Sequence, residues 1–150
     1  MGAGLSYFDL AENDYQFLRH DRDAGRVGNI MCSAAQNICE RYLKHIIDVY
    51  VQDTDTTKVL QTHSLRVLRR FIREVLPDFQ IRWNTALQAD GYYFSTRYPG
   101  NEAFIVDKED VDECWEAVEE TRSAVIRYKE ERENGVCRGH SEKEKCDAGK

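Results

Sequence analysis

The widest apolar pattern in the chain runs through residues 26–50, and it limits the possible folds more than any other feature. Apolar side chains recur there at intervals of three and four residues, which places them on one side of a helix. They are Val27, Ile30, Met31, Ala34, Ile38, Tyr42 and Ile46, and a second row of Ala35, Cys39, Leu43 and Ile47 widens the face. A helix that is apolar over so wide an arc must be covered on most sides. The pattern therefore predicts the central helix of an all-α domain.

Four further segments have helical spacing of apolar residues and are predicted to pack around this helix. They are residues 6–20, 63–76, 78–98 and a segment that begins after Asp107. No segment alternates for long with a period of two, so strands are not expected. Short connections between long amphipathic helices favour antiparallel neighbours. We expect an antiparallel up-and-down helical bundle of about five helices.

Several residues mark where these helices should begin and end. Ser6 followed by Asp9 resembles a capping box with a shorter acid, and Asp107 is a suitable N-cap. Pro77 and Pro99 cannot continue a helix, so each is expected to lie at a boundary. Loops are expected between these points, the first of them at residues 21–25.

Length and composition indicate one domain followed by a charged tail. A chain of 150 residues can form a single core, which we place in residues 1–130. Residues 131–150 are charged and interrupted by glycine, and we expect them to be disordered. No apolar run approaches the ~20 residues of a membrane span, and the N-terminus does not resemble a secretory signal. The expected location is the cytoplasm.

The net charge of −6 argues against a nucleic-acid-binding surface that covers the whole protein, although it allows a local basic patch. The five cysteines do not form a disulfide pattern. Cys32, Cys39 and Cys114 fall on apolar helical faces, so we expect reduced core residues. No motif predicts a metal site or a bound cofactor.

Three stretches in this order resemble the HEPN domain: AAQNICERYLKHII at 34–47, THSLRVL at 62–68 and YYFSTRYPG at 92–100. In the first stretch, the matching positions are Ala35, Gln36, Glu40, Leu43 and Lys44. In the others they are His63, Leu65 and Leu68, and then Tyr93, Arg97, Tyr98 and Pro99. The resemblance covers roughly residues 6–128.

The resemblance implies an all-helical bundle that is often dimeric. Many HEPN domains are paired with a minimal nucleotidyltransferase in two-gene toxin–antitoxin modules. One large branch consists of metal-independent ribonucleases in which four to six residues separate an arginine from a following histidine. Here only three residues separate Arg41 from His45. We therefore expect a member of the non-catalytic branch.

Gln36, Glu40 and Lys44 are four residues apart, so they stack on one helical face. They could line a ligand site, in which Glu40 accepts a hydrogen bond from a base or ribose hydroxyl and Lys44 meets a phosphate. The alternative is a solvated face with an ordinary Glu40–Lys44 pair.

Arg97 precedes Tyr98 and Pro99, where a helix must end. It could satisfy the last carbonyls of that helix, or reach back to Glu40 as a buried clamp. It could also bind a phosphate while Tyr93 or Tyr98 stacks on a base.

Arg66, Arg69, Arg70 and Arg73 form a basic stripe on the helix at 63–76. The stripe could contact an RNA backbone or an acidic partner such as a nucleotidyltransferase, or it could be a solvated face that pairs with Glu74. His63 could be a general base, although a capping or packing role near the helix start is favoured.

The leading hypothesis is a homodimeric, non-catalytic HEPN protein that binds nucleotide or RNA and acts with a nucleotidyltransferase. Its ligand site would be Gln36, Glu40, Lys44, Tyr93, Arg97 and Tyr98. One alternative is a divergent ribonuclease toxin that uses Arg41 and His45 across a dimer interface. Another is a dimeric scaffold without a ligand.

Overall fold

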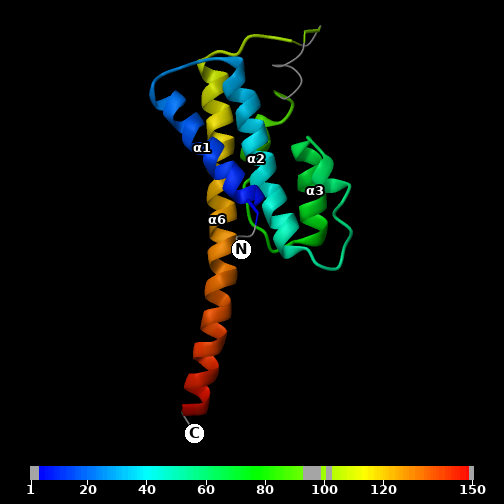
Figure 1. The fold of residues 1–150 in the computed structure, drawn as a ribbon, viewed down its shortest axis with the longest axis vertical. Coiled ribbons are helices and arrows are strands. Elements are labelled where there is room, and N and C mark those ends of the chain that lie inside the picture. The colour runs from blue at the N-terminus through cyan, green and yellow to red at the C-terminus, as the bar shows by residue number, and fades with distance from the viewer. Residues whose placement is uncertain (1–3, 93–98, 101–102, 149–150) are drawn as a thin grey trace.

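The helix predicted to be central is α2 (Asn29–Tyr50), and it lies in the middle of the structure (Figure 1). The computed structural model describes residues 4–92, 99–100 and 103–148, with side chains described as far as residue 134. Helix α1 (Tyr7–Asp23) and helix α6 (Lys108–Ala148) pack on α2, while α3 (Leu65–Val75) packs on it separately. Ile38, Leu43, Ile46 and Ile47 of α2 are fully buried among them.

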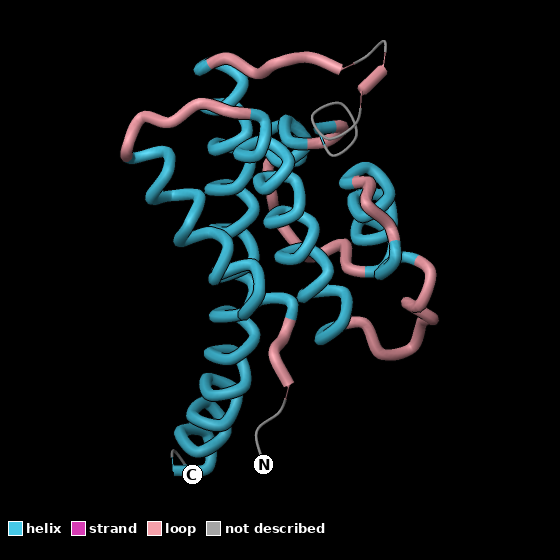
Figure 2. Tube along the Cα trace, turned by 45° about the horizontal axis from the view of Figure 1, so that its top comes forward, coloured by secondary structure: helices cyan, strands magenta, loops and turns pink. Residues whose placement is uncertain are grey.

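The described residues contain five α-helices and no strand, which confirms the all-α prediction. Two 3-10 turns, η1 (Val59–Gln61) and η2 (Leu87–Ala89), and the short α4 (Trp83–Ala86) complete the element order. Helices α1 and α2 run antiparallel, whereas α2 and α6 begin at the same end of the bundle (Figures 1 and 2). The chain between α2 and α6 therefore returns along the side of α2 that α3 occupies.

Local capping explains where the helices begin. The Ser6 hydroxyl accepts from the Asp9 amide at 3.1 Å while the Asp9 carboxylate accepts from the Ser6 amide at 3.0 Å, so the capping box is present. The Asp107 carboxylate likewise accepts from the Asp110 amide at 2.9 Å and starts α6. Helix α1 continues to Asp23, and the following turn uses Gly25 at φ 74°, a left-handed conformation that favours glycine. The loop predicted at residues 21–25 therefore starts later.

The long helix predicted at residues 78–98 is not formed as such. In the described part of this range up to Ala89, helix covers only α4 and η2, and Gly91 then turns at φ 90°. Phe79 is buried, and its ring meets those of Trp83 and Tyr128 edge-on, so tertiary contacts hold the segment before α4 outside a helix. Residues 93–98 lie outside the described part.

Hydrogen bonds to Glu12 tie the three packed helices together. The Glu12 carboxylate of α1 accepts from Arg122 of α6 at 2.7 and 3.2 Å, and from the buried Tyr42 hydroxyl of α2 at 2.7 Å. Burial alone would raise the pKa of Glu12, but the bonds from Arg122 and Tyr42 outweigh it and lower the pKa below its usual value. Cys32, Cys39 and Cys114 are buried free thiols, as predicted.

Helix α6 continues through Ala148, where the sequence predicted a disordered tail. Figure 1 shows that its last part projects beyond the other helices. A helical extension without tertiary packing is marginal in water. Disorder of residues 131–150 and a domain boundary near residue 130 therefore stay predictions. No helix in the described ranges is long and apolar enough to span a membrane.

Candidate ligand-binding site

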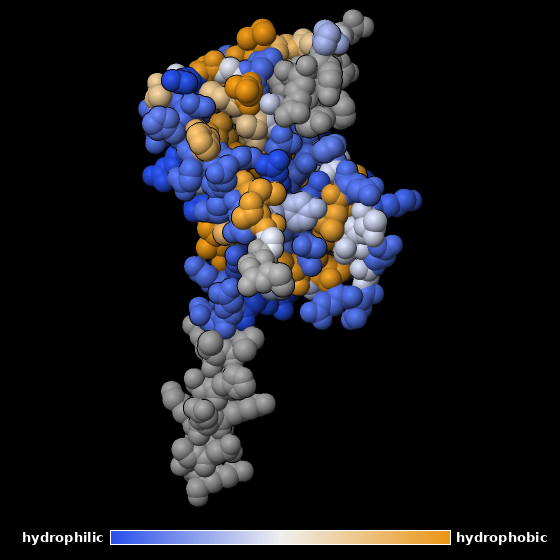
Figure 3. All heavy atoms as spheres, viewed as in Figure 1, coloured by the Kyte–Doolittle hydropathy of each residue, from blue (hydrophilic) through white to orange (hydrophobic). Residues whose placement is uncertain are grey.

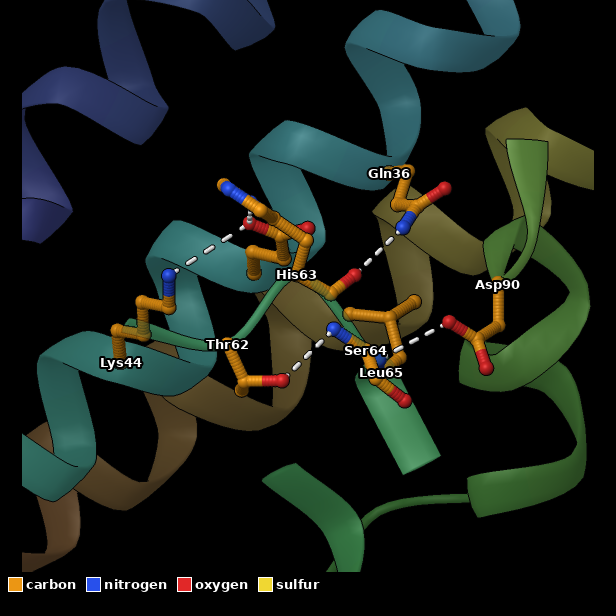
Figure 4. A network of polar contacts seen from close by, with 8 residues as sticks. Gln36, Lys44, Thr62, His63, Ser64, Leu65 and Asp90 are labelled. Carbon is orange, nitrogen blue, oxygen red and sulfur yellow. Dashed lines mark hydrogen bonds and ion pairs between the residues drawn. The ribbon is translucent and has the colours of Figure 1, made fainter. Parts of the chain in front are cut away.

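Gln36, Glu40 and Lys44 form a buried polar cluster on α2. Their exposed fractions are 2%, 3% and 6%, so the alternative of a solvated face is wrong. Figure 4 shows why: the segment from Thr62 to Leu65, which leads into α3, lies across this part of α2. The spacing of four residues placed the three side chains together, and the covering segment removed them from water.

The cluster includes His63, which sequence reasoning had not placed in the site. Glu40 Oε2 lies 3.6 Å from Lys44 Nζ and 3.3 Å from His63 Nδ1. Gln36 Nε2 donates a hydrogen bond of 2.7 Å to the His63 carbonyl oxygen. His63 is the accessible member, because half of its side chain is exposed while the Glu40 side chain is almost covered. The sequence signal that could have assigned His63 to the site was its place in the second HEPN-like stretch, residues 62–68.

The second oxygen of the Glu40 carboxylate, Oε1, is buried and has no hydrogen-bond partner in the part of the chain that the structure describes. A buried acceptor left without a donor costs ~1–3 kcal/mol. Burial raises the pKa of Glu40 above its usual value, although His63 and Lys44 act in the opposite direction. The site thus holds an acceptor that a ligand donor could satisfy.

The start of α3 holds His63 in place. Ser64 is the N-cap of α3, and its hydroxyl accepts from the Val67 amide at 3.3 Å. Thr62 Oγ1 accepts from the Ser64 amide at 3.1 Å, and Asp90 Oδ1 accepts from the Leu65 amide at 2.9 Å (Figure 4). The cap is therefore Ser64, while the His63 ring packs beside Glu40.

Three predicted site residues, Tyr93, Arg97 and Tyr98, lie outside the described residues. The predicted contact between Arg97 and Glu40 therefore stays a prediction.

The arginine stripe lies on the outer side of α3. Arg66, Arg70 and Arg73 are exposed, and Arg69 is partly buried. Arg66 Nε is 3.7 Å from Asp90 Oδ2. Within the described residues no ion pair joins the stripe to Glu74, so the alternative of pairing with that residue is not seen.

Arg41 and His45, the residues of the ribonuclease alternative, both face α1 in a single chain. Arg41 pairs with Asp14, while His45 is 7% exposed and packs on the Phe8 ring at 5.4 Å. Among the residues that were searched, no group of three or more His, Cys, Asp or Glu could hold a metal ion.

Two sizeable clefts in the described surface lie away from the polar cluster. One cleft of about 430 Å³ is lined by Arg82 and by residues of α4 and α6, among them Trp115. Another of about 370 Å³ lies between α1 and α2 beside Phe17 and Ile30. Figure 3 shows a further apolar area at the end where α6 begins, where Val27, Phe104 and Ile105 are exposed. None of these features contains the charged groups of the cluster.

Comparison with models of protein families gives a match over most of the chain. The model of the HEPN domain matches residues 6–132, which include the whole polar cluster and the arginine stripe. Neither a search of curated proteins nor a search of solved structures found a match.

Proposed function

Because the chain belongs to the HEPN domain family, whose members have nucleotide- or RNA-related roles, we propose that it binds a nucleotide or RNA without cleaving it. The proposed site is the cluster of Glu40, Lys44 and His63. The observation that supports it is the Glu40 carboxylate, which is almost fully buried beside a buried lysine and has one oxygen without a hydrogen-bond partner among the described residues.

The energetics of the cluster favour a functional reading. Burying a carboxylate and an ammonium costs several kcal/mol per ion, and apolar residues of similar size often give equal or greater stability. Here the pair is separated by 3.6 Å, and no described residue donates a hydrogen bond to the second carboxylate oxygen. A ligand hydroxyl or amino group that donates to this oxygen would offset part of that cost.

Each residue of the cluster has a role in this proposal. Lys44 supplies a positive charge for a phosphate, and Glu40 accepts from a ribose hydroxyl or a base amino group. His63 lies at the exposed edge, so the ligand reaches the cluster beside its ring. From the sequence we assign Arg97, Tyr93 and Tyr98 to the same site, with arginine on phosphate and tyrosine on the base.

Binding without cleavage is proposed because the arginine–histidine spacing of HEPN ribonucleases is absent. The nearest pair, Arg41 and His45, is separated by three residues, and each member contacts α1. A side chain that is buried against Phe8 cannot act as a general base on RNA without moving.

We place the protein in the cytoplasm as a homodimer that acts with a minimal nucleotidyltransferase in a toxin–antitoxin-like module. The support is family membership, together with exposed apolar and basic surfaces that a partner could cover. A small nucleotidyltransferase encoded next to this chain would support the module, and a stable complex after co-expression would test it directly.

The binding proposal is tested by thermal unfolding with added ATP or GTP. We expect the midpoint to rise with nucleotide concentration, because a ligand that binds only the folded state stabilises it. His63→Ala and Arg97→Ala should each weaken the apparent affinity at least tenfold, so that more nucleotide is needed for the same rise of the midpoint. His20→Ala is the matched control, because His20 is an exposed histidine on α1.

A nucleotide-dependent rise that is unchanged in His63→Ala would place the ligand elsewhere. If no nucleotide or RNA raises the unfolding midpoint, the remaining hypothesis is the dimeric scaffold without a ligand. If the protein degrades RNA without added metal, and His45→Ala does not, the ribonuclease hypothesis is established instead.

A further inference from the structure

The arginines of α3 share one face of a short, peripheral helix. At about 100° per residue, Arg66, Arg69, Arg70 and Arg73 all fall within an arc of about 100°. Leu65, Leu68 and Ile72 are fully buried and hold the other side of α3 against the molecule. Figure 1 shows α3 at the edge of the bundle, and Arg66, Arg70 and Arg73 on this face are exposed.

Most of this positive charge is not used inside the protein. Asp90, whose side chain is 15% exposed, lies near Arg66, but its other oxygen caps the first amide of α3. In the described residues Arg69, Arg70 and Arg73 have no ion-pair partner. Other arginines, such as Arg82, Arg122 and Arg132, are each paired with a carboxylate. The three arginines therefore place positive charge without a bound carboxylate on one face of α3, within the part of the chain that the structure describes.

The composition of the face distinguishes between two kinds of polyanionic partner, an acidic protein and a phosphate backbone. A protein interface needs an apolar core within a polar rim. Viewed down the helix axis, Arg69 and Arg70 are the two edges of this arc, and Arg66 and Arg73 lie between them. All four positions of the arc are arginines, so an apolar core is absent there. A phosphate backbone needs no apolar core, because guanidinium groups bind phosphate oxygens through paired hydrogen bonds. The face thus fits phosphates better than an acidic protein.

We infer that the arginine face of α3 binds the backbone of single-stranded RNA and leads it to the cluster of Glu40, Lys44 and His63. This inference rests on the proposed function, and it extends the ligand from one nucleotide to a strand. The eight residues from Arg66 to Arg73 span about 10 Å along the helix. Several consecutive phosphates can meet a face of that length, since arginine side chains reach well beyond the helix.

The neighbouring residues favour a single strand over a duplex. The His63 ring is half-exposed and stands just before the Ser64 cap, at the end of α3 that carries Arg66. An unpaired base can stack on such a ring, whereas bases within a duplex cannot. A duplex would also bring one negative charge per ~1.7 Å toward a protein of net charge −6.

Fluorescence anisotropy with a short labelled oligouridylate tests the inference in the full chain. Each neutralised phosphate of a single strand contributes about −0.7 to the slope of log K against log salt. Four arginine contacts therefore predict a slope near −2.8, or about 50-fold weaker binding between about 50 and 200 mM salt. The double substitution Arg70→Gln/Arg73→Gln should reduce the magnitude of the slope by about 1.4.

Arg19→Gln is the matched control, because Arg19 is an exposed arginine on α1 and should leave the slope unchanged. ATP-dependent stabilisation is measured on the same variants. A slope reduced by about 1.4 in magnitude, with retained ATP stabilisation, supports the inference. An unchanged RNA slope overturns it while leaving the nucleotide site intact.

Two further outcomes separate the inference from its alternatives. If ATP never stabilises the chain but RNA binding depends on Arg70 and Arg73, the face is established and the nucleotide site is wrong. If polyglutamate of equal charge displaces the RNA as effectively as unlabelled RNA, the face is specific for an acidic protein and the inference fails.

Discussion

His45 shows how burial alone can turn a residue into a source of pH dependence. Burial and then Lys129 lower its pKa below the usual value of 6.5, although Asp48 and Asp9 oppose them. Its Nδ1 atom has no hydrogen-bond partner among the described residues. The unfolded chain therefore takes up a proton at His45 more readily than the folded protein does.

The first prediction follows from the sign of this shift. The stability contributed by neutral His45 is fully present above about pH 6.5 and is lost as the pH falls through 6.5 towards the folded pKa. Urea unfolding of the wild type and His45→Gln between about pH 5 and pH 8 should show that the variant loses part of this pH dependence. His20→Gln is the matched control, because it replaces an exposed histidine on α1.

Glu40 changes the folding stability with pH in the opposite direction to His45. Because its folded pKa is raised, its favourable contribution is present below about pH 4.5 and is lost as the pH rises through the folded pKa. The difference between wild type and His45→Gln, rather than the wild-type profile alone, isolates His45. If the two profiles are parallel, His45 does not titrate differently in the folded state.

At the scale of elements, one side chain of α2 fixes the segment that leads into α6. Asn29 Nδ2 donates to the Phe104 carbonyl at 2.8 Å, and Asn29 Oδ1 accepts from the Val106 amide at 2.8 Å. These two bonds imitate the pairing of a neighbouring strand, although no strand in the described part of the chain pairs with residues 103–106. They explain how this segment is held without a sheet.

The second prediction concerns this pair of bonds. Asn29→Ala should increase hydrogen exchange of the Val106 amide about 5-fold, corresponding to about 1 kcal/mol for a hydrogen bond. Asn29→Asp keeps the acceptor for that amide and should preserve most of its protection. Exchange measured by NMR distinguishes the two variants. Equal exchange in all three proteins would mean that another group protects Val106.

At the scale of the whole molecule, Arg132 marks the point where α6 leaves the bundle. It pairs with Asp78 and also contacts the hydroxyl and ring of Tyr128. The match to the HEPN domain ends at the same residue. Residues after it therefore contribute little to the core that the family model describes.

The third prediction is that deletion of residues 133–150 changes the free energy of unfolding by less than about 0.5 kcal/mol. Arg132→Ala in the full chain should cost up to about 1 kcal/mol, because it removes the contacts with Asp78 and Tyr128. Chemical denaturation monitored by circular dichroism measures both. A larger loss on deletion would show that the tail packs on the bundle.

Much of the helical framework could be predicted because its signals are local. The capping box at Ser6 and the N-cap at Asp107 were correct, and so was most of the apolar face of α2 and of α3. The start of the central face was wrong, because Val27 precedes α2 and Ile30 is 78% exposed. The long fourth helix was wrong, because contacts of Phe79 with Trp83 and Tyr128 override helical spacing there. Part of the site was found for the same local reason, since Gln36, Glu40 and Lys44 share one face of any helix.

By itself the sequence determined which segments are helical and which side of each is apolar, because periodicity, caps and prolines act over a few residues. Only the tertiary structure decided that the polar side of α2 is buried and that His63 joins Glu40 there. The physical reason is that burial depends on which distant segment covers a face. Residues 62–65 lie on Gln36, Glu40 and Lys44 through packing of α3, which no local pattern reports.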